Sequence, residues 1–249
     1  MPRASLFIPC IVDLVLPSIG ESTAAIVRHV GHTPIYHQEQ TCCGLMAFNS
    51  GFRDEARKLA RHFIQVFEDD AVIVSPSGSC VNMVRNRYPQ LFADEPAWQR
   101  RALALAPRVF ELSQFLVDHA GVTDLGARRQ ATVAYHESCS TLNGLGVSAQ
   151  PKALLGAVQG TTLVPLKGAD VCCGFGGTFS NSFPEISTAL VVQKVGYFLE
   201  SGADVLVMSD PGCLLNIQGY LHRHHPGKSA MHLADYLAGG LPGNPGRRP

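Results

Sequence analysis

The sequence predicts an α/β protein built from two pseudo-symmetric halves, each a parallel β-sheet flanked by helices. Apolar strand-like runs alternate with stretches of helical spacing along most of the 249 residues, which is typical of parallel sheets. The chain also contains an internal repeat, because the triplet Cys42-Cys43-Gly44 returns as Cys172-Cys173-Gly174. We therefore expect one Rossmann-like repeat at 1–122, a second at 123–238, and a disordered Gly- and Pro-rich tail at 239–249.

The first half shows three strand-like runs with helices between them. Pro17 suits a first helical turn, and the apolar residues after Arg53 recur at helical spacing. Strands are expected at Ser5–Pro9, Thr33–Tyr36 and Ala71–Val74, and helices at Pro17–His29, Arg53–Phe67, Val81–Tyr88 and, broken by Pro107, Trp98–His119.

The second half restarts the pattern near residue 131. The run Val205-Leu206-Val207 precedes Cys213 as Val72-Ile73-Val74 precedes Cys80, and His232–Leu237 repeats the apolar spacing of Leu112–Leu116. Strands are expected at Ala131–Tyr135, Thr161–Pro165 and Val205–Met208, and helices at Pro151–Val158, at Pro184–Glu200 and after Cys213.

All eight cysteines of the chain take part in the repeat, four in each half and in the same order. The ligand sites of a parallel α/β sheet lie beyond the carboxyl ends of its strands, where these cysteines fall. We expect two metal sites, one formed by Cys10, Cys42, Cys43 and Cys80, the other by Cys139, Cys172, Cys173 and Cys213.

The residues alone do not identify the metal. Four thiolates suit an iron–sulfur cluster or zinc, and adjacent cysteines favour a larger cluster because they can bind different irons. Gly44 and Gly174 remove a side chain beside the thiolates, so backbone N–H groups can approach the sulfurs. His37 and His136 are either auxiliary ligands or proton donors, or ordinary histidines of a loop or strand end.

Composition sets the remaining bounds. The formal net charge is zero, so bulk electrostatics suggest neither nucleic acid nor an anionic membrane as a partner. The apolar stretch Leu6–Leu16 is interrupted by Pro9 and Asp13, so we expect neither a signal peptide nor a membrane span. We place the protein in the cytoplasm, where disulfides are disfavoured and eight cysteines indicate metal or redox chemistry.

The twin triplets and their flanking cysteines resemble the cysteine-rich CCG-domain family. Its pattern is a cysteine, a gap of thirty-odd residues, Cys-Cys-Gly, a similar gap and Cys-x-x-Cys, usually present twice. The resemblance spans Ser5 to Leu237 and is greatest to the lactate-utilization branch. Relatives include the B subunit of heterodisulfide reductase and the iron–sulfur subunit of glycolate oxidase. This chain departs from the pattern at Met83 and Asn216, which replace the last cysteine of each half.

The resemblance implies an iron–sulfur electron-transfer subunit of a multi-protein system for L-lactate oxidation, rather than a complete enzyme. It implies a 4Fe–4S cluster in each half, held by the eight cysteines, and a ferredoxin-type iron–sulfur protein among the partners. Two alternatives stay open: an interaction scaffold stabilised by zinc in at least one half, and a thiol–disulfide reductase of the heterodisulfide reductase type. The absent fifth cysteines argue against the reductase.

Overall fold

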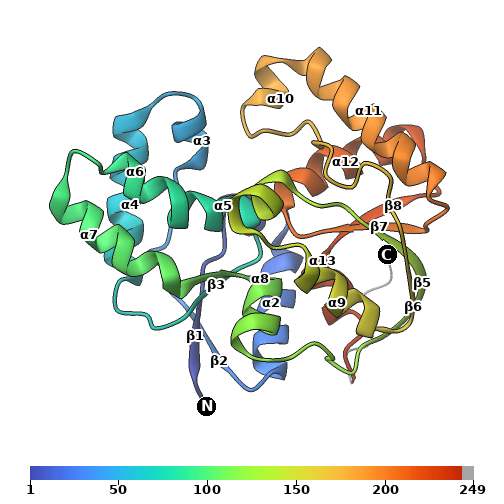
Figure 1. Ribbon diagram of the computed structural model, residues 1–249, viewed down its shortest axis with the longest axis horizontal. Helices are drawn as coiled ribbons and strands as arrows, with labels where there is room; N and C mark the ends of the chain where they lie inside the picture. The colour runs from blue at the N-terminus through green and yellow to red at the C-terminus, as the bar shows by residue number, and fades with distance from the viewer. Residues whose placement is uncertain (243–249) are drawn as a thin grey trace.

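The computed structural model describes residues 1–242 and contains two four-stranded parallel sheets (Figure 1). The first sheet has the order β2-β1-β3-β4 and the second the order β6-β5-β7-β8, so the two halves share one topology. The strands are β1 Arg3–Leu6, β2 Thr33–Tyr36, β3 Ile73–Ser75, β4 Val109–Glu111, β5 Arg128–Tyr135, β6 Gln159–Val164, β7 Val205–Met208 and β8 Ser229–His232. The predicted fold class and the internal repeat are confirmed.

Helices fill the connections between the strands. In the first half they are α1 Cys10–Val15, α2 Pro17–His29, α3 Leu45–Asn49, α4 Arg53–Phe67, α5 Gly78–Asn82, α6 Tyr88–Leu91, α7 Pro96–Leu105 and α8 Leu112–Gln114. In the second half they are α9 Ala149–Ala157, α10 Phe179–Ser182, α11 Pro184–Glu200, α12 Pro211–His224 and α13 Leu233–Ala238. Short π-helical turns occupy Met83–Arg87, Phe115–His119 and Ser140–Gly144, and a 3₁₀ turn occupies Ala106–Arg108.

The sequence predicts the long helices and two of the four-residue strands, but it misses β4 and β8. The bounds of α2, α4, α11, β2 and β7 agree with the predicted ranges. The helix predicted over Trp98–His119 is wrong in its middle, because β4 lies there, and β8 was not predicted at all. With three and four residues, β4 and β8 are too short to show a clear period of their own. Within the predicted tail, Leu241 is buried, and residues 243–249 lie outside the described residues.

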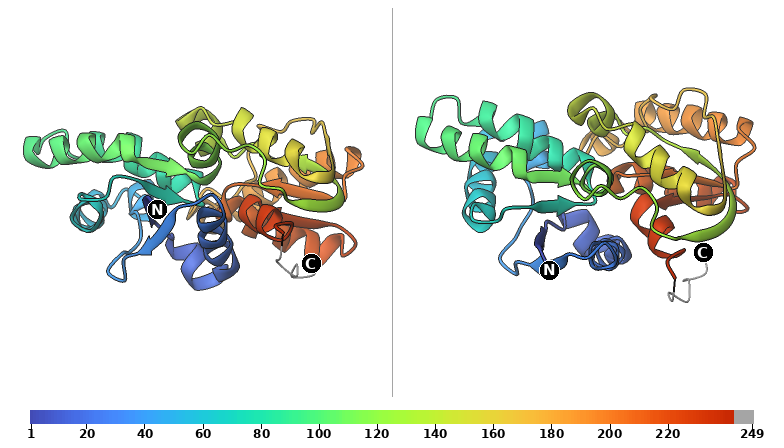
Figure 2. Two further views of the ribbon diagram at one scale, coloured as in Figure 1. Left: turned by 90° about the horizontal axis from the view of Figure 1, so that it is seen from below. Right: turned by 60° about the horizontal axis from the view of Figure 1, so that its bottom comes forward.

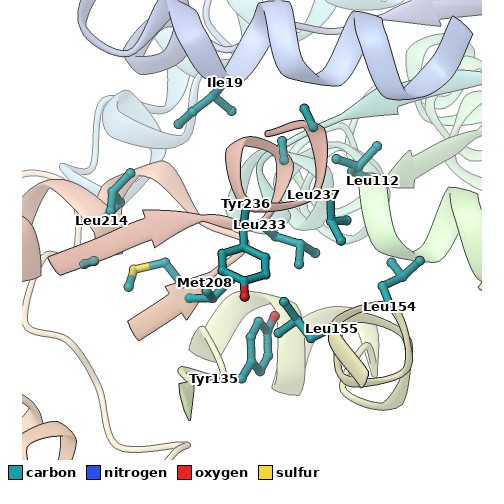
Figure 3. Packing of buried hydrophobic residues seen from close by; sticks show 14 of the residues in the cluster. Ile19, Leu112, Tyr135, Leu154, Leu155, Met208, Leu214, Leu233, Tyr236 and Leu237 are labelled. Carbon is teal, nitrogen blue, oxygen red and sulfur yellow. The ribbon is translucent and has the colours of Figure 1, made fainter. Parts of the chain in front are cut away.

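Besides a core within the first half, the protein has a larger hydrophobic core that both halves share. In it, α2 of the first half packs on α13 of the second, and α8 of the first packs on α9 of the second, as a pseudo-twofold relation requires. Figure 3 shows Ile19 of α2 and Tyr236 of α13 among the residues of this core. Ser18 and Ser22 of α2 donate hydrogen bonds of 3.1 and 2.6 Å to the carboxylate of Asp235 in α13. The halves are therefore joined through packed helices.

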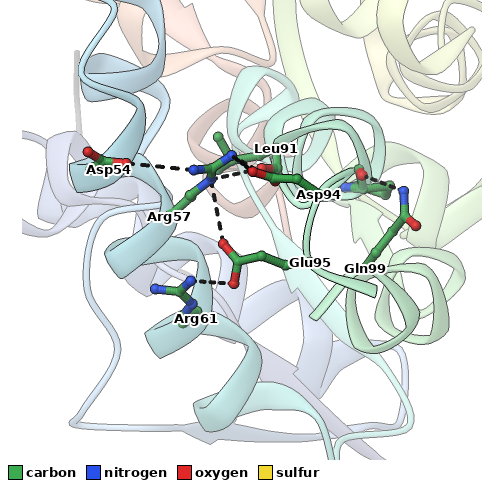
Figure 4. Close-up of polar contacts among 8 residues, drawn as sticks. Asp54, Arg57, Arg61, Leu91, Asp94, Glu95 and Gln99 are labelled. Atoms are coloured by element: carbon green, nitrogen blue, oxygen red, sulfur yellow. Dashed lines mark hydrogen bonds and ion pairs between the residues drawn. The ribbon is translucent and has the colours of Figure 1, made fainter. Parts of the chain in front are cut away.

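The first half carries an addition at its outer end, the α6–α7 pair, which lies away from the second half (Figures 1 and 2). Arg57 of α4 donates to the Asp94 carboxylate at 2.8 Å and to the Leu91 carbonyl at 3.1 Å, and Arg61 pairs with Glu95 (Figure 4). These contacts fasten α6 and α7 to α4. In the second half α12 is followed in chain order by β8, without such a pair.

Candidate metal centre

The cysteines occupy the switch point of each sheet, where strand order reverses and parallel α/β proteins bind ligands. From β1 the chain passes to β2 on one side and then to β3 on the other. Cys10 begins α1 after β1, and Cys80 lies in α5 after β3. In the second half, Cys139 follows β5 and Cys213 lies in α12 after β7.

All eight cysteines line a single cavity of about 210 Å³ between the two halves. We call Cys10, Cys42, Cys43 and Cys80 the first half-site, and Cys139, Cys172, Cys173 and Cys213 the second half-site. The sequence predicted four cysteines together in each half, and the structure also brings the two sets face to face. A bulk water occupies about 30 Å³, so the cavity has room for a group of several atoms. All eight side chains are free thiols.

The first half-site holds Cys42 as its most acidic thiol. Cys43 and Cys80 are buried, whereas Cys10 and Cys42 are partly exposed. Hydrogen bonds from Cys10 and Cys43, together with the Gly44 N–H at 3.3 Å from Sγ, lower the pKa of Cys42 to about 3. The same hydrogen bond to Cys42 and burial raise the pKa values of Cys10 and Cys43. Crowded thiols cannot all ionise without a cation, and this donor set therefore fits a soft metal.

The second half-site repeats this arrangement. The Gly174 N–H lies 3.4 Å from Cys172 Sγ, and hydrogen bonds from Cys139 and Cys173 help lower the pKa of Cys172 to about 2. Cys173 donates to Cys213 across 3.0 Å between the sulfurs, and this bond leads the causes that lower the pKa of Cys213 to about 6. Both CCG glycines have positive φ, +85° at Gly44 and +87° at Gly174, a left-handed conformation that favours glycine over residues with a Cβ.

One group in the second half-site has the spacing of ligands to a single ion. His136 and the thiols of Cys173 and Cys213 are buried, and their ligand atoms all lie within 4.8 Å of one another. The other candidate histidine, His37, forms an ion pair with Asp70 at 2.7 Å and does not line the cavity. The structure therefore brings one of the two predicted histidines to the thiols.

Lys194 is a buried cation behind the second half-site that sequence reasoning missed. Its Nζ donates to the carbonyls of Gly168 and Ala169 at 2.5 and 3.0 Å. Burial lowers its pKa to about 8, while the nearby thiolates of Cys173 and Cys213 oppose that shift. The signal was available, because Lys194 lies three residues after Val191 and four before Phe198 on the apolar face of α11.

Asp210 joins the two half-sites and was also missed. Its Oδ1 accepts from the Gly212 N–H at 3.1 Å and caps α12, while its Oδ2 accepts from the Ser79 N–H at 2.9 Å in the first half. The equivalent cap in the first half is Ser77, which accepts from Cys80 N. An aspartate followed by proline is a recognisable helix start, although the link to Ser79 depends on tertiary structure.

The two positions without a fifth cysteine have structural roles. Met83 is fully buried in the core of the first half. Asn216 donates its side-chain N–H to the Cys173 carbonyl at 2.8 Å. In the first half Tyr88 makes the matching bond, from its hydroxyl to the Cys43 carbonyl at 2.8 Å. Each buried twin cysteine thus has its carbonyl held by a side chain from the following helical segment.

Known proteins share both the motif and its arrangement. Residues 4–85 and 133–218 match the cysteine-rich domain called CCG. The chain is 48% identical over 244 residues to lactate utilization protein A of Exiguobacterium sp., covering 97% of this chain and 99% of that protein. It is 40% identical over 235 residues to the protein of the same name from Bacillus subtilis, covering 94% and 98%.

A hypothetical protein from Helicobacter pylori has a similar fold, with a TM-score of 0.63 at 10% identity. The match covers 96% of this chain and 49% of that one. Over residues 1–242, no helix combines the length and apolar character needed to span a bilayer. With the domain matched twice and full-length relatives at this identity, the chain belongs to the family of cysteine-rich CCG-domain proteins.

Proposed function

We propose that the protein is an iron–sulfur electron-transfer subunit of a multi-protein system that oxidises L-lactate. The observation that carries this proposal is the convergence of two four-thiol sets on one cavity at the carboxyl ends of two parallel sheets. The link to lactate rests on the relatives named lactate utilization protein A.

Iron–sulfur clusters suit this donor set for three reasons. Adjacent cysteines can bind different irons of one cluster, soft thiolates are the ligands that iron–sulfur clusters require, and the cavity exceeds the volume of a single ion. The N–H groups of Gly44 and Gly174 already point at Cys42 and Cys172, and such hydrogen bonds tune a cluster's reduction potential.

The residues of the chain would hold such clusters, shield them and leave one side open. When bound, an iron–sulfur cluster supplies one-electron transfer. Cys43, Cys80, Cys173 and Cys213 are buried, whereas Cys10, Cys42 and Cys172 are partly exposed and Cys139 is exposed. Electrons would enter or leave at the exposed side, where a ferredoxin-type iron–sulfur protein of the same system would dock.

Metal analysis of the anaerobically purified protein tests this function. We expect iron and acid-labile sulfide in comparable amounts, and a broad absorption band that bleaches on reduction. Negligible iron and sulfide after anaerobic purification and reconstitution would contradict the proposal.

A zinc-stabilised scaffold is the second candidate, and one observation favours it. The ligand atoms of His136, Cys173 and Cys213 lie close enough together for one tetrahedral ion. Roughly stoichiometric zinc in the same measurement, with negligible iron and sulfide, would select the scaffold. Zinc together with a single cluster would assign different metals to the two half-sites.

A further inference from the structure

The two half-sites differ in the residue that lies three positions before the first cysteine. This residue is Phe7 before Cys10 and His136 before Cys139. The two residues occupy the same place in the fold, because the Phe7 N–H donates to the carbonyl of Val74 in β3 at 2.9 Å, and the His136 N–H donates to the carbonyl of Val207 in β7 at 2.8 Å.

The surroundings of these two side chains have opposite character. Phe7 is fully buried, and its ring meets those of Phe63 and Phe67 at centroid distances of 4.7 and 5.8 Å. His136 is 1% exposed and faces the thiols of its half-site. An apolar wall in one half is therefore replaced by an imidazole in the other.

The hydrogen bond at Nδ1 of the His136 ring determines whether Nε2 can act as a ligand. Nδ1 lies 3.2 Å from the Ala169 carbonyl oxygen, which can only accept, so Nδ1 carries the proton. In the neutral ring Nε2 then presents a lone pair. Nε2 is buried without a hydrogen-bond partner among the described residues, and the ring's ligand atom lies within 4.8 Å of the thiols of Cys173 and Cys213. Metal-binding histidines commonly have this arrangement, with the second nitrogen bound to a backbone carbonyl.

Lys194 supports the orientation of the ring. Its Nζ donates at 3.0 Å to the same Ala169 oxygen that accepts from His136, and to Gly168 O as well. The carbonyl that orients the imidazole is thus held in place by a buried cation.

We propose that His136 ligates, through Nε2, an iron of the second half-site. The second half-site then has five donors, four thiolates and one imidazole, whereas the first has four thiolates and an apolar wall at Phe7. The inference rests on the proposed function for the presence of iron. We expect the second half-site to have the higher reduction potential, because the bound imidazole adds no negative charge and the nearby Lys194 cation favours the reduced cluster.

Pulsed electron paramagnetic resonance on the reduced, anaerobically reconstituted full chain tests the ligand. The protein is prepared with ordinary and with ¹⁵N-labelled histidine. We expect the strong coupling of a directly bound nitrogen, which changes with the histidine label. It should disappear in His136→Phe, which copies the first half, and persist in the matched control His37→Phe, whose histidine pairs with Asp70 outside the cavity.

A second variant separates loss of the ligand from loss of the cluster. His136→Cys should retain the iron and sulfide of the wild type, lose the nitrogen coupling and lower the midpoint potential of the second half-site. A wild-type protein with both half-sites loaded and no histidine coupling would overturn the inference, as would coupling that survives in His136→Phe.

The design also distinguishes this inference from the proposed function. If neither half-site takes up iron and sulfide, the electron-transfer function fails. The ligand role of His136 is then judged with Co²⁺ loaded alone into the apoprotein, by the same labelled-histidine coupling. Its absence there would reject His136 as a ligand to any metal.

Discussion

The first and second half-sites hold their thiols in equivalent backbone arrangements, but the side chains around those thiols differ. Both have an acidic first twin cysteine, a glycine of positive φ and a side-chain bond to the second twin cysteine. The surroundings differ at three matched pairs, which are Phe7 and His136, Met83 and Asn216, and Ser77 and Asp210. The thiol-bearing frame is thus duplicated, while the polarity around it is not. If both frames hold a metal, we expect them to differ in reduction potential or in the metal that they bind.

The largest expected effect comes from removing one matched thiol in each half. Cys43→Ser and Cys173→Ser should each lower iron and sulfide by roughly half, because a serine hydroxyl replaces thiolate poorly as a ligand of iron. Quantitation of iron and sulfide per chain after anaerobic reconstitution checks this. Unchanged iron in Cys43→Ser would reject that ligand, and loss of all iron in either variant would mean that the cavity holds one composite unit.

The two CCG glycines should respond unequally to alanine. Both have positive φ, and this conformation alone costs alanine about 1–2 kcal/mol. A Cβ on Gly44 would lie 3.4 Å from the Ala56 carbonyl oxygen, whereas a Cβ on Gly174 would lie 2.5 Å from that of Ser187. We therefore expect Gly44→Ala to cost about 1–2 kcal/mol and Gly174→Ala about 3–4 kcal/mol, since overpacking adds to the strain.

Urea unfolding of the reduced apoprotein measures both losses. Equal losses in the two variants would show that the loop after Cys173 yields to the added methyl group, and the geometric difference between the halves would then have no energetic consequence.

A buried ionisable side chain caps the helix that follows the last strand of each sheet, so the stability of the two halves can be compared as a function of pH. Glu111 ends β4 and accepts from the backbone of Ser113 and Gln114, and His232 ends β8 and accepts from Ala234 N. Both are fully buried. Burial raises the pKa of Glu111 to about 7 and lowers that of His232. Each cap is thereby pushed toward its neutral form.

The sign of the Glu111 effect follows from proton binding. Between pH 4.5 and about 7 the folded chain keeps the proton that the unfolded chain has released, so this group makes stability fall as pH rises. A shift of this size corresponds to about 3 kcal/mol. Glu111→Gln should match the wild type near pH 4 and exceed its unfolding free energy by about 3 kcal/mol at pH 8. Urea unfolding of both proteins at several pH values measures this difference. If the difference in unfolding free energy stayed constant from pH 4 to pH 8, Glu111 would be ionised in the folded chain.

The grouping of four cysteines in each half and the long helices could be predicted from the sequence, because both depend on patterns within short stretches of chain. Cysteines placed after successive parallel strands must meet at one edge, and the seventeen residues of α11 show their apolar face in the sequence. The sequence predicts helix at β4 because its three residues follow the turn at Pro107 and run directly into α8. A strand of this length acquires its identity from pairing with β3.

The composite cavity could not be predicted, because it depends on how the halves pack. The contacts of α2 with α13 and of α8 with α9 join residues far apart in sequence. The same holds for the bond between Asp210 and Ser79, separated by 131 positions. The sequence marks His136 as a candidate, but the carbonyl on one side of its ring belongs to Ala169 and the thiols on the other to Cys173 and Cys213, which are distant in sequence.

The smallest expected effect concerns the side chains that bind the carbonyls of the second twin cysteines. Tyr88→Phe removes the donor to Cys43 O, and Asn216→Leu removes the donor to Cys173 O. Tyr88 is fully buried, so loss of its hydroxyl leaves the Cys43 carbonyl out of reach of water, whereas Asn216 is only partly buried. We expect about 1–2 kcal/mol for Tyr88→Phe and under about 1 kcal/mol for Asn216→Leu, measured by urea unfolding. A larger loss for Asn216→Leu than for Tyr88→Phe would mean that the polar contact in the second half stabilises the fold more than the buried contact in the first. The contrast between the halves would then extend from the surroundings of the thiols to the stability of the fold.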